Sequence, residues 1–472
     1  MTIGKLSDDV LLNIFRYCLD ASPRFWLRLV HICHKWRHIV FASQQALRLR
    51  LVCTHGTPVL KTLDCWPTLP IVVQYGVHPV PSLPTTDSED EDNIMAALKQ
   101  SDRVTSVSLI VTNSLLEKLS AIEKPFLELE ELVLRSRDSV PLTLPSAFRW
   151  GLRLRALHLT RAIIPALPEL LSPCTDLVDL QLHKIPNLGY FSPDSIANAL
   201  SGMTHLRLLS LRFLSSTLPR NSRGLPPQSG KRFVLLSLTC FKYRGTSVYL
   251  DSFLARIDAP RLRDIDIGFF SQPKMVTLHL ARFINHIETQ KSHLQADILS
   301  SEHAISISLT QPEAPLRLEL QISCNLLTRQ LSYMAQICIG LSSFLLGVEH
   351  LCTSVTRTRS GQDDSDREEW LKLIRPFKGT KWVQVVGEHS TNLVLALQHS
   401  QIRRETVLPS LCKLCIREPE PPYAPLRDAV ASFMHARRRL GHIIALEYER
   451  SWINERRGIG TAFVQCPFFS SY

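Results

Sequence analysis

The 472-residue sequence lacks the short motifs by which many catalytic sites are recognised. It contains no glycine-rich phosphate loop, no G-x-S-x-G elbow and no H-E-x-x-H zinc motif. Its one C-x-x-C pair, Cys412 and Cys415, has no second pair and no histidine at zinc-ligand spacing. We therefore expect a protein that is not an enzyme and that uses no metal or other cofactor.

The sequence also lacks a secretory signal, because no basic segment followed by an apolar stretch opens it. The uncharged window from Gln330 to Val348 carries three serines, two glutamines and two glycines, which favours a buried helix over a membrane span. The twelve cysteines are scattered, which is typical of small buried residues in a reducing compartment. We expect the cytoplasm, the nucleus or both, and no contact with a membrane.

Charge of one sign is only slightly in excess. Lysine and arginine number 54 against 43 acidic residues, a formal net charge of +11. The basic cluster Arg437–Arg439 ends a helical pattern, where cations favour the helix dipole, and aromatic residues are not interleaved with it. Nucleic acid is therefore not the expected partner, although a nucleic-acid-binding repeat protein stays open as an alternative.

The first 45 residues predict two short helices. Asp8 and Asp9 are typical of a helix start, and Leu11 and Phe15 follow on one apolar stripe. Ser22-Pro23 signals a second helix, with its own stripe ending at Val40. Two helices of this length cannot enclose a core, so their apolar faces need another surface.

This arrangement resembles the F-box, whose pattern begins Leu-Pro-x-Glu/Asp and ends Val-Cys-x-x-Trp/Phe. The corresponding ends here are Leu6-Ser7-Asp8-Asp9 and Ile32-Cys33-His34-Lys35-Trp36, so Ser7 replaces the usual proline. A pair of ordinary amphipathic helices is the alternative. Further stretches are similar to fungal F-box proteins with degenerate leucine-rich repeats: Trp66–Ile71, Trp370–Phe377, Val407–Leu411 and Gly441-His442.

The resemblance implies a substrate adaptor of a cullin–RING (SCF-type) ubiquitin ligase, with an unknown protein substrate. The F-box helices are then expected to lay apolar side chains against a Skp-type linker protein. The residues expected to form that face are Leu6, Leu11, Leu12, Ile14, Phe15, Leu29, Ile32 and Trp36. The alternative is a repeat-based interaction scaffold whose F-box no longer binds the linker.

A Leu-x-x-Leu-x-Leu pattern recurs from about residue 104. Its copies are Leu129/Leu132/Leu134, Leu154/Leu157/Leu159, Leu177/Leu180/Leu182, Leu206/Leu209/Leu211, Phe233/Leu236/Leu238 and Leu262/Ile265/Ile267, with a late copy at Leu411/Leu414/Ile416. The middle residues of the first six copies are 25, 23, 29, 27 and 29 residues apart, as in leucine-rich repeats. The ninth position, usually Asn or Cys, is Arg137, Ala162, Ile185, Leu214, Phe241 and Phe270, so the array is irregular. A leucine-rich α/β fold of another kind stays open.

We therefore predict an α/β fold, with a short N-terminal helical F-box followed by an irregular leucine-rich-repeat solenoid. Residues 1–45 are the helical domain and 46–103 a proline-rich and acidic linker, whose segment 80–92 reads as an exposed loop. Residues 104–300 hold the repeats, and 301–472 continue them with strands at 305–309 and 316–322 and then alternating helices and strands.

Target recognition is expected on the open face of the repeat strands, where residues flank the inward leucines. This face mixes both charges with uncharged polar groups, as protein-binding surfaces do. Its candidate residues are Glu131, Arg135, His158, Asp179, Gln181, His183 and Arg212. A solvated face with no partner is the alternative.

Overall fold

The computed structural model describes residues 6–21, 25–54, 59–65, 69–76, 88–137, 141–148, 153–164, 166–215, 232–272, 275–287, 293–312, 314–324, 326–355, 364–386, 390–402, 407–418 and 424–450. The chain divides into two compact units, Met1–Thr289 and Gln290–Tyr472. The boundary predicted from the sequence, after residue 300, is later in the chain than this division. The difference arises because strand β14 (Leu294–Ser300) pairs with β15 (Ala304–Gln311) and β17 (Val348–Val355) and so belongs to the second unit.

The first unit begins with three helices: α1 (Asp8–Ala21), α2 (Trp26–Leu29) and α3 (His34–Ala42). The single second helix that the sequence predicted is interrupted, because Cys33 adopts an extended conformation before α3. Arg37 Nε donates a hydrogen bond of 2.9 Å to the carbonyl of Val30 at this break. The rings of Phe15 and Trp36 pack with centroids 4.9 Å apart and join α1 to α3.

Residues 46–103, expected to be a linker, instead contribute regular structure to the sheet. They contain β1 (Leu51–Thr54), α4 (Val59–Cys65), β2 (Ile71–Tyr75) and α5 (Ser88–Leu98). β1 pairs with β2, and β2 with β3 (Val104–Val111), all in parallel. The sequence did not reveal these strands because β1 and β2 are only four and five residues long and prolines are frequent from residue 58 onward. Residues 80–87 of the predicted exposed loop lie outside the described residues.

The acidic end of that predicted loop, residues 88–92, is helical. Glu91 in α5 is buried and accepts hydrogen bonds from Ser114 (2.9 Å) and Thr112 (3.2 Å). Lys118 Nζ lies 3.1 Å from the Glu91 carboxylate. α5 therefore packs against α6 (Asn113–Ser120) through a satisfied buried carboxylate, which a run of acidic residues does not reveal by itself.

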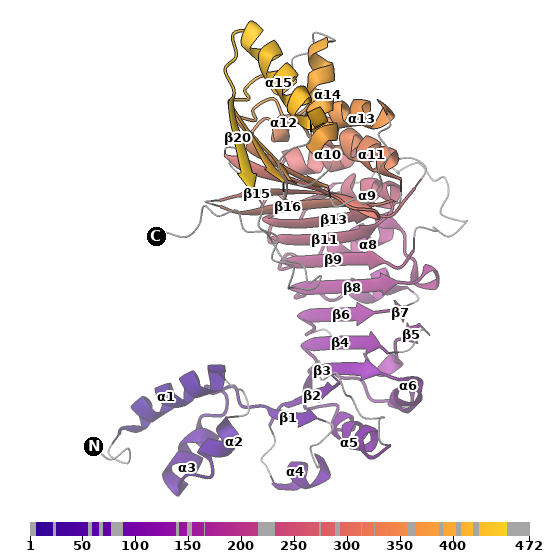
Figure 1. Ribbon diagram of the computed structural model, residues 1–472. Coiled ribbons are helices and arrows are strands. Elements are labelled where there is room, and N and C mark those ends of the chain that lie inside the picture. Colours follow the sequence, from indigo (N-terminus) through magenta and orange to yellow (C-terminus); the bar gives the residue numbers. More distant parts are fainter. Residues whose placement is uncertain are drawn as a thin grey trace. The chain divides into compact units, whose positions relative to one another are not determined.

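The repeat strands follow in chain order along one parallel ladder (Figure 1). After β3 come β4 (Glu131–Ser136), β6 (Ala156–Thr160), β8 (Asp179–Ile185), β9 (Leu208–Phe213), β11 (Cys240–Gly245) and β13 (Asp264–Phe269). In register, Leu132, Leu157, Leu180 and Leu209 stand side by side and are buried. As the repeat pattern predicted, the leucines form one continuous core layer.

One repeat lies in a different register from the prediction. Leu236 is 58% exposed, whereas Phe241 and Tyr243 on β11 are buried in register with Leu209 and Leu211. The copy is therefore Leu238-x-x-Phe241-x-Tyr243, with aromatic rings in place of two leucines. The Leu-x-x-Leu-x-Leu pattern did not reveal this copy because the pattern has aliphatic residues where the copy has Phe241 and Tyr243.

Returning segments connect these strands along the other side of the sheet. They include α6, α7 (Leu167–Leu171), α8 (Pro193–Leu200), α9 (Ser247–Leu254), α10 (Leu278–Asn285), the short helices η2 (Ser146–Phe148) and η3 (Asn187–Gly189), and the two-residue strands β5 (Leu142–Thr143), β7 (Ala162–Ile163), β10 (Phe233–Val234) and β12 (Ile257–Asp258). α8 begins where Ser192-Pro193 predicted, and Ser192 Oγ accepts from Ser195 N at 3.0 Å. Asp251 of α9 accepts from His279 N of α10 at 2.7 Å, so one repeat caps the helix of the next.

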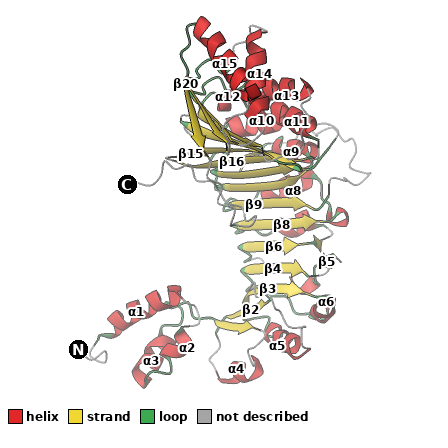
Figure 2. Ribbon diagram, viewed as in Figure 1, coloured by secondary structure: helices red, strands yellow, loops and turns green. Residues whose placement is uncertain are grey.

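The second unit combines an antiparallel group with a parallel one (Figure 2). β14, β15 and β16 (Ala314–Ser323) are antiparallel neighbours, whereas β14, β17, β18 (Trp382–Val386), β19 (Lys413–Glu418) and β20 (Ala445–Arg450) run parallel. Its helices are α11 (Leu327–Gly340), α12 (Ser342–Leu345), α13 (Asp364–Ile374), α14 (Ser390–Ile402) and α15 (Ala424–Arg439). The strands and helices predicted after residue 300 are thus confirmed.

Two residues of this unit differ from their expected environment. Cys415, placed by the repeat pattern on an exposed strand face, is fully buried. Arg437, expected among exposed helix-terminal cations, is also buried; its guanidinium donates to the carbonyls of Val407 and Leu408. Burial lowers the pKa of Arg437. This arginine holds a loop and is not part of a basic surface.

Candidate functional site

The candidate site is the open strand face, formed by side chains of β4 to β13 that alternate with the buried leucines. All seven residues predicted from the sequence lie on it. Strand register brings Glu131, Ala156, Asp179, Leu208, Cys240 and Asp264 into one row and Val133, His158, Gln181, Ser210, Lys242 and Asp266 into the next. Arg135, Thr160 and His183 begin a third row. Strand pairing thus places residues 54 positions apart in sequence within contact of each other.

Opposite charges pair between strands on this face. Arg212 Nη2 donates to Asp266 Oδ2 at 2.9 Å, and Lys242 Nζ lies 3.7 Å from Asp264. His158 Nε2 lies 2.9 Å from Asp179 Oδ2. These groups are partly exposed, so the pairs fix side-chain geometry more than they stabilise the fold.

Two polar residues on the face anchor acidic groups. Ser106 Oγ donates to Glu131 Oε2 at 2.9 Å, and Gln181 Nε2 contacts Asp179 Oδ1 at 3.1 Å. Glu131 and Asp179 consequently present oriented carboxylates. Arg135 is exposed further along β4, on the same side of the strand as Glu131, and forms no ion pair or hydrogen bond among the described residues. The face therefore offers carboxylate acceptors near the start of the strands and an exposed guanidinium near the end of β4.

His183 is a strongly perturbed titratable group of the face. Its Nε2 lies 3.0 Å from Ser210 Oγ. Burial and, next, the nearby Arg212 lower the pKa of His183 to about 4. At neutral pH the ring is uncharged, so it presents a hydrogen-bonding edge and not a cation.

Cys240 lies within the same charge network and is not a nucleophile. Burial and a hydrogen bond to Asp264 (3.2 Å) raise the pKa of the Cys240 thiol to about 12. The reactive form of cysteine is the thiolate, which is scarcely populated here at neutral pH. Burial and the Asp264 contact thus disfavour the reactive form of Cys240.

Lys242 and Arg244 belong to this face but were not among the predicted residues. Both lie on β11, the strand whose register the leucine pattern misplaced. Aromatic and basic residues alternate here in the order Phe241, Lys242, Tyr243, Arg244. This period-two alternation was the sequence signal that could have identified Lys242 and Arg244 as outward-facing residues.

The N-terminal helices place the predicted linker-binding residues in two groups. Leu11, Phe15 and Leu29 are buried within the chain, so their inclusion in an exposed face was wrong: they form the contacts between the helices. Leu6, Leu12 and Trp36 are half-buried, and Ile14 and Ile32 are exposed.

Val10 and Tyr17 were missed by sequence reasoning, although they belong to a row of exposed apolar side chains on α1. Val10, Ile14 and Tyr17 are 44%, 42% and 80% exposed, and their spacing places them on one side of the helix. Ile32 adds a fourth exposed apolar side chain after α2. We name Val10, Ile14, Tyr17 and Ile32 the exposed apolar set. Ile14 and Ile32 were among the predicted residues, whereas Leu11, Phe15 and Leu29 face inward.

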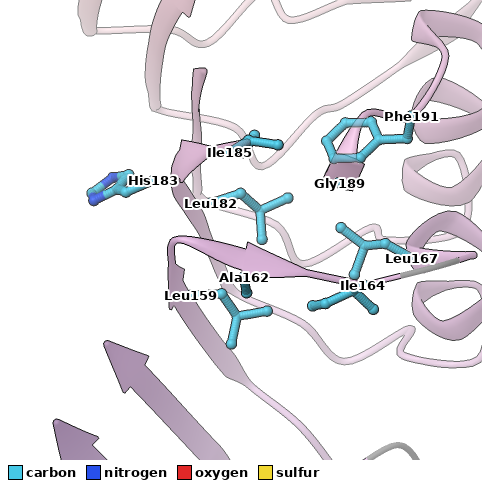
Figure 3. Close-up of a pocket in the computed structure, with 9 residues that line it drawn as sticks. All are labelled: Leu159, Ala162, Ile164, Leu167, Leu182, His183, Ile185, Gly189 and Phe191. Carbon is cyan, nitrogen blue, oxygen red and sulfur yellow. The ribbon is translucent and has the colours of Figure 1, made fainter. Parts of the chain in front are cut away.

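A small apolar cavity lies behind the open strand face (Figure 3). Leu159, Leu182 and Phe191 are among its lining residues, and its volume of about 10 Å³ holds no more than a water-sized molecule. Ligand pockets are roughly 300–1,000 Å³. Figure 3 shows the His183 ring directed away from the gathered apolar side chains. This is a packing gap of the core, not a ligand site.

Within the described part of the chain, no three His, Cys, Asp or Glu side chains are grouped so that they could hold a metal ion. Of the described helices, none combines the length and apolar character needed to cross a bilayer.

The successive parallel strands and their returning segments form a solenoid-like sheet of leucine-rich repeats. No family model and no curated protein matches the sequence. Among solved structures, the leucine-rich repeat-containing protein LegL7 from Legionella pneumophila is similar, with 14% identity over 81% of this chain and 96% of that chain. The TM-score of 0.29 is low, so this likeness carries no argument about function.

Proposed function

We propose that this chain is the substrate-recognition adaptor of an SCF-type cullin–RING ubiquitin ligase. In this proposal α1–α3 bind a Skp-type linker protein, and the open strand face binds a target protein. The adaptor performs no bond chemistry itself. By holding the target beside the ligase, it raises the effective concentration of target lysines around the ubiquitin-bearing enzyme.

The exposed apolar set carries the proposal. The N-terminal helices bury one stripe within the chain yet still expose Val10, Ile14, Tyr17 and Ile32. Burying a fully exposed apolar side chain contributes roughly 1.5–3 kcal/mol before the cost of association, and these partly exposed side chains each contribute a fraction of that amount. The helices resemble an F-box in sequence, and a helix-in-groove contact with a linker is the role which that resemblance implies.

The open strand face supports the second half of the proposal. It combines the free guanidinium of Arg135, the neutral ring of His183 and the oriented carboxylates of Glu131 and Asp179. Mixed polar groups of this kind are common where proteins meet. The carboxylates oppose binding to a phosphate backbone, which favours a protein target over nucleic acid.

A titration of the purified full chain with a recombinant Skp-type linker tests the assignment. Ile14→Asp with Tyr17→Asp places two charges in the apolar contact and is expected to weaken linker binding at least a hundredfold. Arg16→Glu is the matched control: Arg16 is also exposed on α1, and the net-charge change is equally minus two. It is expected to bind as the parent does. Failure of the folded parent to bind any linker would favour the scaffold alternative.

A further inference from the structure

A row of positions marks the amino-terminal ends of the repeat strands in the first unit. Backbone hydrogen bonds connect each position to the next: Arg155 N to Glu130 O (2.7 Å), Val178 N to Arg155 O (2.8 Å), Arg207 N to Val178 O (2.8 Å), Thr239 N to Arg207 O (2.9 Å) and Arg263 N to Thr239 O (2.9 Å). We name this row the amino-terminal rim. It is distinct from the open strand face because it lies where the strands begin (Figure 1).

Arginine occupies every second position of this rim. Arg155, Arg207 and Arg263 precede β6, β9 and β13, and all three are exposed. Within the described residues their guanidinium groups form no ion pair or hydrogen bond. Other arginines near the strand starts behave differently: Arg103 donates to the Leu69 carbonyl at 3.0 Å, and Arg153 pairs with Glu128.

Neighbouring charges leave the rim basic. Arg261, two residues before Arg263, is also exposed and unpaired among the described residues. Two acidic groups accompany the rim: Asp176, two residues before Val178, is exposed, and Glu130, the first rim position, lies 3.6 Å from Arg50. Val178 and Thr239 separate the three rim arginines without adding charge. A segment crossing the strand ends therefore meets a positive charge at each second strand.

The spacing of these charges selects the conformation of a partner. Neighbouring strands lie about 4.8 Å apart, so arginines on alternate strands are roughly 9.6 Å apart. A polyproline II segment rises about 3.1 Å per residue with three residues per turn, so every third side chain shares one side at about 9.3 Å intervals. In a β-strand, by contrast, residues three apart point to opposite faces.

We propose that the amino-terminal rim binds an extended acidic protein segment in the polyproline II conformation, with a carboxylate at every third residue. Arg155, Arg207 and Arg263 each pair with one carboxylate of the segment. Single-stranded nucleic acid is the weaker fit, because such sites stack bases on aromatic side chains and the rim positions are Glu, Arg, Val and Thr. The proposal is independent of the ligase assignment, since neither the exposed apolar set nor the open strand face takes part.

Fluorescence anisotropy with the full chain tests this proposal. The probe is a labelled peptide of four Glu-Pro-Pro repeats, and the comparison peptide has the same composition with its four glutamates adjacent. The spaced peptide is expected to bind at least fivefold more tightly. Raising the NaCl concentration from 50 to 300 mM is expected to weaken binding severalfold, because exposed ion pairs are screened.

Removing the three rim charges is the decisive comparison. Arg155→Ser, Arg207→Ser and Arg263→Ser together are expected to weaken binding of the spaced peptide at least tenfold, and each single change severalfold. The matched control is Arg137→Ser, Lys184→Ser and Arg244→Ser, three exposed cations beside the opposite, carboxyl ends of the strands. It is expected to bind normally. Thermal unfolding midpoints verify folding, and the single variants decide the matter if the triple variant does not fold.

Three results would overturn the proposal. They are equal binding of the two peptides, equal loss in the rim and control variants, and tighter rim-dependent binding of poly-uridine than of the spaced peptide. The last result would assign the rim to nucleic acid.

Discussion

Arg212 on β9 and Asp266 on β13 form an ion pair across the intervening strand β11, with 2.9 Å between Nη2 and Oδ2. The pair joins two strands that share no backbone hydrogen bond. It also positions the Arg212 charge near His183, whose pKa it helps to lower. One side chain thus influences both the arrangement and the protonation of the open strand face.

Replacing Arg212 by Met is expected to raise the pKa of His183 while changing stability by less than about 1 kcal/mol. The pair is partly exposed, so its contribution to the folding free energy is small, whereas removing the cation favours protonated histidine. An NMR titration of the His183 ring measures the pKa. Arg244→Met is the control, since Arg244 is not among the charges that act on His183. An unchanged His183 pKa in Arg212→Met would contradict the assigned cause.

His183 is expected to make the fold less stable as the pH falls. Its folded-state pKa of about 4 is below the ordinary 6.5, so between these values the unfolded chain binds the proton first and stability falls with the pH. His183→Gln removes this contribution. Chemical denaturation at pH 7.5 and pH 5 is expected to show that the parent loses about 1–2 kcal/mol more than the variant, with allowance for solvent screening. Equal losses would show that His183 does not carry this dependence.

Leu180→Ala is expected to cost roughly 2–5 kcal/mol of unfolding free energy, because the removed side chain leaves a cavity in the core. Leu180 is fully buried on β8, and its neighbour Gln181 points to the other side of the same strand. Gln181→Ala is therefore the matched control, with an expected loss of about 1 kcal/mol or less. Urea denaturation of the two variants makes the comparison. Similar losses would mean that the two faces of β8 were assigned incorrectly.

Glu91→Ala is expected to destabilise the first unit by about 1–3 kcal/mol, since Ser114 and Thr112 lose a buried hydrogen-bond acceptor. Asp92→Ala tests the same helix at an exposed carboxylate, which is 73% exposed and pairs with the same Lys118. Its expected cost is below about 1 kcal/mol. Thermal unfolding measures both. If Asp92→Ala destabilised the protein more than Glu91→Ala, the buried carboxylate would have been assigned to the wrong residue.

The repeat strands could be predicted where the core used leucine and not where it used other apolar residues. Leu157 and Leu180 repeat at a regular interval, and a periodic pattern is a strong signal. Phe241 and Tyr243 occupy the same layer but interrupt the leucine pattern, and the adjacent Lys242 and Arg244 were lost with them. β1 and β2 were missed because each is short and prolines are frequent from residue 58 onward.

The candidate surfaces were predictable to different degrees. On the strands, period-two alternation separates inward from outward residues, so Arg135 and Gln181 were placed correctly on the open strand face. On α1 the stripe of Leu11 and Phe15 was real, yet a stripe does not say whether it contacts the chain itself or a partner. Only the packing of Phe15 against Trp36 settled that question, and it directed attention to Val10 and Tyr17.

Repeat arrays change length by gaining or losing whole copies. The hydrogen bond from His279 N to Asp251 limits where this chain can do so, because the acceptor for the first turn of α10 is supplied by the preceding copy. A copy inserted between α9 and α10 would separate the two groups unless it brought its own acidic residue at the equivalent position. The carboxylate of Asp251 therefore restricts which insertions this junction accepts to those that preserve a cap for α10.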